Sequence, residues 1–200
     1  MRGGCVTNIR PDVTVAVMSY NNSAYIAQTI ESVLAQEGVS LELFVFDDCS
    51  KDQTLDVLQR YTSDARFSYE VNPNNLGMMG NYNRCLRAGT GRFVVVLGSD
   101  DLLYPGHLAS QVAALELHPE SDLVYTQCQW IDEKGAVTQQ PVHPGHHPCS
   151  YFGRHDEVVD LLRFVFIQTP RDVHVFVTSV FTFVIDVADR TDILTRWSEV

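Results

Sequence analysis

The sequence is poor in positive charge. Its 200 residues hold 14 lysines and arginines against 25 aspartates and glutamates, which gives a formal net charge of −11. A surface of that charge repels phosphate backbones and anionic lipid headgroups, which argues against nucleic acid as a partner. Peripheral association with a membrane is left open. An anionic ligand would need local help from helix N-termini, a few arginines or a metal ion.

The sequence also lacks a hydrophobic run long enough to cross a membrane. Its longest apolar stretch, Val173–Val187, is interrupted by polar residues and is shorter than the roughly 20 residues of a spanning helix. Its valines, phenylalanines and threonines predict strand instead. The N-terminus has no apolar signal-peptide segment. The five cysteines are odd in number and show no CxxC spacing, so we expect reduced thiols and a cytoplasmic protein.

Several cofactor motifs are missing as well. No GxGxxG follows the first predicted strand, and no GxxxxGK[ST], GxSxG or HExxH occurs anywhere in the chain. These absences argue against a Rossmann dinucleotide site, a P-loop, a serine hydrolase elbow and a zinc protease. What the chain does have is 45% hydrophobic residues, enough for the core of one domain that we expect to span residues 1–200.

Hydrophobic periodicity predicts strands that alternate with helices through the first 120 residues. This alternation is typical of an α/β fold with a mostly parallel sheet covered by helices on both faces. A further strand over residues 122–132 leads into the turn "EKG" and suggests a hairpin. The predicted strands are residues 13–18, 41–46, 66–71 and 92–97, and the predicted helices are residues 23–36, 50–61, 78–88 and 105–117.

Polar residues follow three of these strands where each strand ends. They are "SYNN" after the first strand, "DDCS" after the second and "SDD" after the fourth. Ligands of parallel sheets bind outside the carboxyl ends of the strands, so we expect the three segments to meet at one site. Other polar residues nearby, the asparagines at 72, 74, 75, 81 and 83, are assigned to turns and caps.

The adjacent carboxylates Asp100 and Asp101 repel each other and need compensation. Hard oxygen ligands of this kind suit Mg²⁺ or Mn²⁺, which would also bind substrate phosphates. The alternative is that Ser99 or Asp100 caps the helix that begins near Pro105. Ser50 is the expected cap of the helix over residues 50–61, which leaves Asp48 free to accept a hydrogen bond. A histidine group in a Pro/Gly-rich segment is assigned to a solvated loop in preference to a metal site; it comprises His143, His146 and His147.

Five motifs in order carry a resemblance to a known family. They are "VAVMSYNNSAYIAQTIESVLAQ", "ELFVFDDCSKDQT", "NNLGMMGNYNRCL", "GRFVVVLGSDDLLYPGHL" and "HPESDLVYTQ". Together they resemble the inverting family 2 glycosyltransferases with the GT-A fold, over residues 12–132. The resemblance implies that residues 12–132 bind a nucleotide-sugar donor and that residues 133–200 form an acceptor-side part, which need not be complete.

The resemblance also implies roles for individual residues. Tyr20 matches the aromatic that stacks on the donor's base, and Asp48 matches the carboxylate that accepts from the ring N3–H of uracil or thymine. Asp101 matches the main ligand of the Mn²⁺ or Mg²⁺ ion, with Asp100 near the ribose and the metal, and Arg84 lies where a basic residue could face the diphosphate. Asn75, Gly77 and Asn83 match the family's "NxG…N" element. The implied nucleotide-binding set is Ser19, Tyr20, Asn21, Asp48, Asn75, Gly77, Arg84, Ser99 and Asp100.

Two departures from the family pattern are visible. Gly98 occupies the position where the metal motif often carries a further aspartate, which weakens the metal site without removing it. The family's catalytic carboxylate segment is matched only in part by "ADRTDILTRW", where Arg190 occupies the expected acid. Asp189 and Asp192 are therefore the two candidates for the general base.

The implied activity is transfer of a sugar from a UDP- or dTDP-linked donor to an acceptor hydroxyl, with inversion. The acceptor would be a carbohydrate or a lipid-linked molecule, as in bacterial polysaccharide or glycoconjugate synthesis. Two alternatives remain at this point. A non-catalytic nucleotide-sugar-binding protein would keep Asp48 and lack a working base. A nucleotidyltransferase would carry a Gly-rich basic loop after the first strand, which "SYNNSAY" is not.

Overall fold

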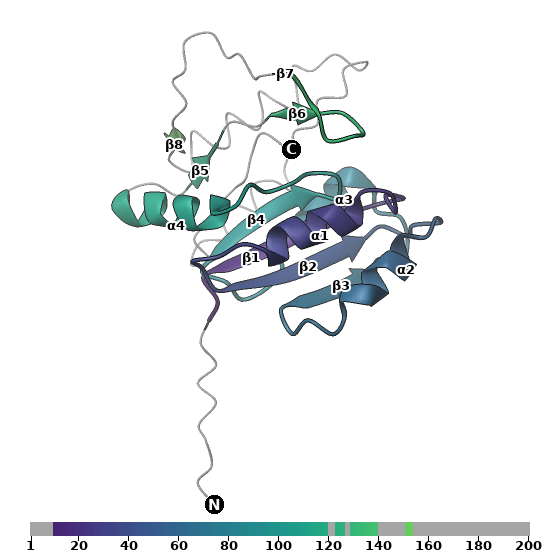
Figure 1. Cartoon of the computed structure of the whole chain (residues 1–200). Coiled ribbons are helices and arrows are strands. Elements are labelled where there is room, and N and C mark those ends of the chain that lie inside the picture. The colour runs from purple at the N-terminus through teal and green to yellow at the C-terminus, as the bar shows by residue number, and fades with distance from the viewer. Residues whose placement is uncertain (1–9, 120–122, 127–128, 140–150, 154–200) are drawn as a thin grey trace, which may run out of the picture.

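The computed structural model describes residues 10–119, 123–126, 129–139 and 151–153. Their main feature is a four-stranded, all-parallel sheet with the strand order β3-β2-β1-β4 (Figure 1). The predicted α/β class is therefore confirmed. The strands are β1 (Val13–Ser19), β2 (Leu41–Asp47), β3 (Phe67–Val71) and β4 (Phe93–Gly98), and the helices are α1 (Ile26–Leu34), α2 (Thr54–Leu58, continued by the 3₁₀ turn Gln59–Tyr61), α3 (Gly77–Leu86) and α4 (His107–Leu117).

The order of the strands reverses once. The chain begins at β1, adds β2 and β3 on one side, and then crosses to β4 on the other side of β1. Because parallel crossovers are right-handed, this reversal moves the third helix to the opposite face of the sheet. In Figure 1, α1 and α3 lie on opposite sides of the sheet, and α3 contacts β1, β2 and β4. The helices thus cover both faces, as the sequence predicts.

Burial on both faces explains why the strand sequences are continuous apolar runs. On one face, Val15, Val17 and Val95 pack with Ile26 and Ile30 in the main core cluster. Apolar residues of α1 at i, i+4 and i+7 supply the stripe that covers this face. Every residue of β4 is buried, although β4 is an edge strand of the described four-stranded sheet.

The remaining described strands form two short antiparallel pairs. β5 (Leu123–Tyr125) pairs with β8 (Tyr151–Gly153), and β6 (Trp130–Ile131) pairs with β7 (Val137–Gln139) around the predicted "EKG" turn. The single strand expected over residues 122–132 is therefore two strands with different partners. Among the described residues, no helix is both long enough and apolar enough to cross a membrane.

One expected helix cap, and one alternative cap, are wrong. Helix α2 begins at Thr54, and the hydroxyl of Ser50 donates to Asp47 at 2.5 Å instead of capping that helix. Helix α4 begins at His107 after the left-handed Gly106, with no side-chain cap. Ser99 accepts a hydrogen bond from Asn22 and takes no part in α4. The alternative in which Ser99 or Asp100 is merely a helix cap is thereby removed.

At the amino ends of the strands, Glu42 ties three segments together. Its Oε1 accepts from the Thr14 hydroxyl at 2.6 Å and from the Gly91 backbone N–H at 3.0 Å, and it also accepts from the Thr90 backbone N–H. The turn before β4 is thus held to β1 and β2. The contact is tight, because a Cβ on Gly91 would lie 2.4 Å from the Thr14 backbone nitrogen.

We expect Glu42→Ala to lower the free energy of unfolding by about 2 kcal/mol, or roughly 4–8 °C in Tm, because several donors lose their acceptor together. Glu42→Gln retains an acceptor oxygen and should cost less than half as much. Thermal unfolding of both variants measures the difference. Equal losses in the two variants would show that Oε1 is not the source of the stability.

At the carboxyl ends, Asp52 ties the loop after β1 to the start of α2. Its Oδ2 accepts from the Ser23 backbone N–H at 2.9 Å, and its Oδ1 accepts from the backbone N–H and the hydroxyl of Thr54 at 3.0 and 2.5 Å. Burial alone would raise the pKa of Asp52, but the hydrogen bonds from Thr54 and Ser23 outweigh it and lower the pKa to about 2. The folded state therefore favours the ionised carboxylate of Asp52 over its protonated form.

A depressed pKa in the folded state stabilises the protein above the unfolded pKa of about 4 and loses that effect as the pH falls toward 2. Wild type should therefore lose stability faster than Asp52→Asn between pH 4 and pH 2. Chemical unfolding at pH steps across this range measures the two slopes. Asp56→Asn, in the adjoining helix α2, controls for removal of one negative charge. Parallel curves for wild type and Asp52→Asn would contradict the assignment.

Candidate functional site

The parallel register brings the ends of all four strands to one edge of the sheet. Ser19 lies opposite Asp47, Asp47 lies opposite Val71, and Met18 lies opposite Gly98. The residues that follow the four strands therefore emerge side by side; they are Tyr20, Asp48, Asn72 and Ser99. The strand order reverses between β1 and β4, and a crevice outside the carboxyl ends is expected at such a reversal. The polar segments predicted to converge do converge here.

Hydrogen bonds join the loop after β1 to its neighbours on both sides. Asn22 Nδ2 donates to Ser99 Oγ at 2.8 Å, which links β1 to β4. Toward β2, the Asn21 backbone N–H donates to Ser50 Oγ and the Lys51 backbone N–H donates to Asn21 Oδ1, each at 2.7 Å. Among the described residues, Asn21 (φ 50°) and Cys49 (φ 66°) are the non-glycine positions with positive φ. Backbone strain of this kind gathers at functional sites.

Tyr20 is the exposed aromatic of this edge. It follows β1 directly, and 52% of its surface is accessible, while Ser19 before it is buried. A large aromatic held open on a tied loop can stack on a planar ring. This position is compatible with the predicted base-stacking role.

Asp48 lies at the opposite extreme, with 4% of its surface accessible. Its Oδ1 accepts from Asn72 Nδ2 at 2.7 Å and from the Leu76 backbone N–H at 2.8 Å, and its Oδ2 accepts from the Gly77 backbone N–H at 2.9 Å. Two of these donors are at the N-terminus of α3, where a carboxylate is favoured. Asn75 holds the same turn, because its Nδ2 donates to the Asp48 carbonyl at 3.1 Å. Gly77 has a positive φ of 71°, which glycine adopts at little cost.

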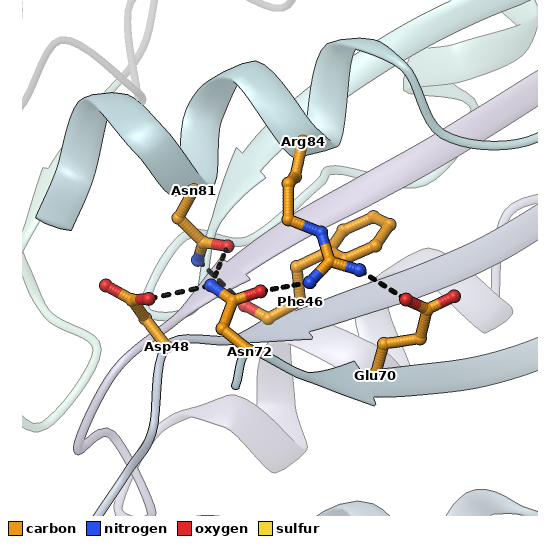
Figure 2. A network of polar contacts seen from close by, with 6 residues as sticks. All are labelled: Phe46, Asp48, Glu70, Asn72, Asn81 and Arg84. Atoms are coloured by element: carbon orange, nitrogen blue, oxygen red, sulfur yellow. Dashed lines mark hydrogen bonds and ion pairs between the residues drawn. The ribbon is translucent and has the colours of Figure 1, made fainter. Parts of the chain in front are cut away.

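Figure 2 shows a polar network that extends from Asp48 into the space between α3 and the sheet. Asn72 donates to Asp48 and to Asn81 Oδ1 (3.1 Å), and Asn81 Nδ2 donates to the Phe46 carbonyl at 2.8 Å. Arg84 stacks on Phe46, with 4.9 Å between its Cζ and the ring centroid, and donates to Asn72 Oδ1. Asn72 and Asn81 are 2% and 3% exposed, so the centre of the network is buried, whereas its Arg84 end reaches the surface.

Sequence reasoning assigned Asn72 and Asn81 to turns and caps, and it missed this network. Two signals were available. Asn72 is the first residue after a predicted parallel strand, the same position that Asp48 has after β2. Asn81 lies inside a predicted helix, where asparagine is unfavourable unless its side chain has a specific partner.

Arg84 does not point at an open crevice in this structure. Its guanidinium donates to Asn72 and forms an ion pair with Glu70 of β3. The role at the diphosphate therefore stays a prediction. Asn83, from the same family element, is half-buried, and its carbonyl accepts from Arg87.

The carboxylate pair after β4 lies at the surface end of the site. Asp100 is exposed, and half-buried Asp101 accepts from the Gly98 backbone N–H at 3.3 Å. The described residues contain no group of three or more histidine, cysteine, aspartate or glutamate side chains that could hold a metal. Two adjacent carboxylates still fit Mg²⁺ or Mn²⁺, since such ions keep water and ligand oxygens in the rest of their coordination sphere.

The two candidate bases, Asp189 and Asp192, lie outside the described residues, as do His143, His146, His147 and the predicted strand within 173–187. Both cysteines of the described part are free thiols. Cys49 donates to the Asn72 carbonyl at 3.0 Å, and burial raises the pKa of the Cys85 thiol.

Comparison with known proteins agrees with this arrangement. The family model described as "Glycosyl transferase family 2" matches residues 14–172, which extends past the motif resemblance at residues 12–132. EpsE of Bacillus subtilis (strain 168) is 35% identical over 130 residues, 64% of this chain and 47% of that protein. The succinoglycan biosynthesis protein ExoO of Rhizobium meliloti (strain 1021) is 41% identical over 102 residues, 51% of this chain and 29% of that protein. The chain spans less than half the length of either relative.

A solved structure shares the fold. Residues 1–349 of TarS from S. aureus, in complex with UDP-GlcNAc, align with a TM-score of 0.53 and 27% identity, covering 64% of this chain and 37% of that one. The parallel sheet, the polar strand ends and the family match agree with one another. The chain belongs to glycosyl transferase family 2 and has the α/β sheet of the GT-A fold.

Proposed function

We propose that this chain binds a nucleoside-diphosphate sugar and transfers the sugar to an acceptor hydroxyl with inversion. One observation carries the proposal. The in-register strand ends bring an exposed aromatic, a buried carboxylate and an acidic pair to one edge of the sheet, namely Tyr20, Asp48 and Asp100-Asp101. The aromatic and the buried carboxylate suit the base of a nucleotide, and the acidic pair suits the ribose and a metal ion on the diphosphate.

Recognition of the base would fall to Tyr20 and Asp48. Tyr20 would stack on the ring, and Asp48 would accept a hydrogen bond from a ring N–H, which uracil and thymine carry at N3. Support for a uridine donor comes from TarS, which was solved with UDP-GlcNAc and resembles this chain at 27% identity. We therefore infer a UDP- or dTDP-linked sugar.

The diphosphate would lie over Asp100 and Asp101. Two carboxylates beside a diphosphate repel it, so a divalent cation, Mn²⁺ or Mg²⁺, is needed to join them. Asp101 is the favoured ligand and Asp100 the second. A cation bound there would offset the negative charge that develops on the leaving diphosphate.

In the transfer step, a carboxylate takes the proton of the acceptor hydroxyl as general base. The acceptor oxygen bonds to the anomeric carbon as the bond from that carbon to the diphosphate oxygen breaks, through an oxocarbenium-like transition state. Attack on the face opposite the leaving group inverts the anomeric centre. Asp189 and Asp192 remain the candidates for this base.

The acceptor is proposed to be a carbohydrate or a lipid-linked molecule in polysaccharide or glycoconjugate synthesis. ExoO, by its name a succinoglycan biosynthesis protein, supports this proposal at 41% identity over 102 residues. We expect the protein to act in the cytoplasm, where nucleotide sugars are available, with peripheral contact to a membrane if the acceptor is lipid-linked.

A thermal-shift screen tests the donor assignment. UDP and dTDP at about 100 times Kd should each raise Tm by roughly 5–10 °C, and GDP should raise it less, because guanine is a larger purine whose ring N–H lies beside an exocyclic NH₂ group instead of between two carbonyl oxygens. Adding Mn²⁺ should enlarge the shift. Equal shifts with GDP, or no shift with any of the three, would contradict the proposal.

Asp101→Ala tests the metal assignment. This variant should lose the Mn²⁺-dependent part of UDP binding and fall to background in sugar transfer. Its Tm without ligand should stay within a few degrees of wild type, because the side chain is half-buried and makes a long hydrogen bond to Gly98. Asp56→Ala removes a charge elsewhere and should keep both properties. Turnover like wild type in Asp101→Ala would reject the assignment.

A further inference from the structure

We infer that Asn72 is a positioning residue for Asp48, and that through Asp48 it sets the preference for a base with a ring N–H. The inference rests on the proposed function, because it assigns a cause to base selection at the same site. The observations that carry it are the directions of the hydrogen bonds around the Asn72 amide and the number of donors on Asp48 (Figure 2).

Arg84 fixes which way the Asn72 amide faces. A guanidinium only donates hydrogen bonds, so the group that it meets on Asn72 must be the amide oxygen. Arg84 itself is held from two further sides, by its ion pair with Glu70 and by its stacking on Phe46. The amide oxygen of Asn72 is thus turned away from Asp48, and its NH₂ group is turned toward it.

Asn81 enforces the same orientation from the other side. Its own NH₂ group donates to the Phe46 carbonyl, which only accepts, so its amide oxygen faces Asn72. That oxygen can receive only the NH₂ group of Asn72. A flipped Asn72 would place two oxygens in contact and would face the Arg84 donors with its own NH₂. The buried network therefore permits one orientation of Asn72.

The oriented amide leaves Asp48 with one open acceptor position. An ionised carboxylate accepts about four hydrogen bonds, two on each oxygen. Asn72 and the Leu76 N–H occupy Oδ1, and the Gly77 N–H occupies one position on Oδ2. Among the residues that the structure describes, the second position on Oδ2 has no donor, and we assign it to a ligand. Asn72 and the N-terminus of α3 hold the Asp48 carboxylate from two directions. The remaining acceptor position on Oδ2 therefore has a fixed orientation, which suits a single ring N–H.

A comparison of UDP binding with CDP binding distinguishes a role of Asn72 in orienting Asp48 from a role in stabilising the fold. Uracil carries a hydrogen on N3, whereas N3 of cytosine is an acceptor and would meet the Asp48 oxygen without a proton. Wild type should bind UDP more tightly than CDP. If Asn72 only stabilised the fold, its loss would weaken both ligands equally.

The test is calorimetric titration of UDP and CDP, with Mn²⁺, into wild type and Asn72→Ala. The UDP Kd should rise about tenfold or more in the variant while the CDP Kd changes less than threefold, since only UDP uses the oriented acceptor. Asn74→Ala, an exposed asparagine of the same loop, should leave both Kd values unchanged. A preference for UDP that survives in Asn72→Ala overturns the inference alone. Failure of wild type to bind UDP overturns the proposed function as well.

Variants of Arg84 provide a second route if Asn72→Ala folds poorly. Arg84→Met removes the donors that orient Asn72, so it should reduce the UDP preference about threefold to tenfold. Arg84→Lys keeps a donor-only group and should restore most of that preference. If Arg84 instead binds the diphosphate, Arg84→Met will weaken UDP and CDP alike, and that result overturns the inference.

Discussion

Four parallel strands in register deliver four loops to the same edge of a sheet, and in this protein those loops carry the polar residues. The alignment of Ser19, Asp47 and Val71 across β1, β2 and β3, with β4 one residue out, sets which residues emerge together. The crossover to β4 on the far side of β1 then opens the edge where α1 and α3 diverge to opposite faces. A one-residue slip of any strand would turn its polar residue away from the site, so the tight packing of both faces protects the geometry of the site.

At this edge, hydrogen bonds offset the cost of burying each polar side chain. Asp48, Asn72 and Asn81 are all less than 5% exposed, and every one of them takes part in several hydrogen bonds. A fully satisfied buried network is rigid, because each change of rotamer leaves an unpaired group. The acidic pair follows the opposite rule. Asp100 is exposed and Asp101 is half-buried, so both charges keep water while the strand before them is buried. The water around both side chains screens the repulsion between these adjacent charges.

The site divides into parts with different physical demands. Base recognition needs a directed acceptor, and we assign it to Asp48, a buried carboxylate directly after β2 that accepts hydrogen bonds from Asn72 and from the N-terminus of α3. Diphosphate and metal binding need charge and room, and they are assigned to the solvent side of β4. The chain spans less than half the length of EpsE and ExoO. We propose that its described part binds the donor and that acceptor choice depends on residues outside that part.

The sequence by itself determined the α/β class, all four strands of the main sheet to within a residue or so, and the identity of Tyr20, Asp48, Asp100 and Asp101 as residues at strand ends. These follow from local patterns, namely periodicity and the polar residue after an apolar run, together with the family motifs. The sequence misplaced the cap at Ser50, because several nearby polar residues compete for a helix start and only the fold selects among them. Only the tertiary structure shows the contacts of Asn72. Its partners Asp48 and Arg84 lie 24 residues before it and 12 residues after it in the sequence. Folding brings them together, and only then is it fixed which group of the Asn72 amide donates and which accepts.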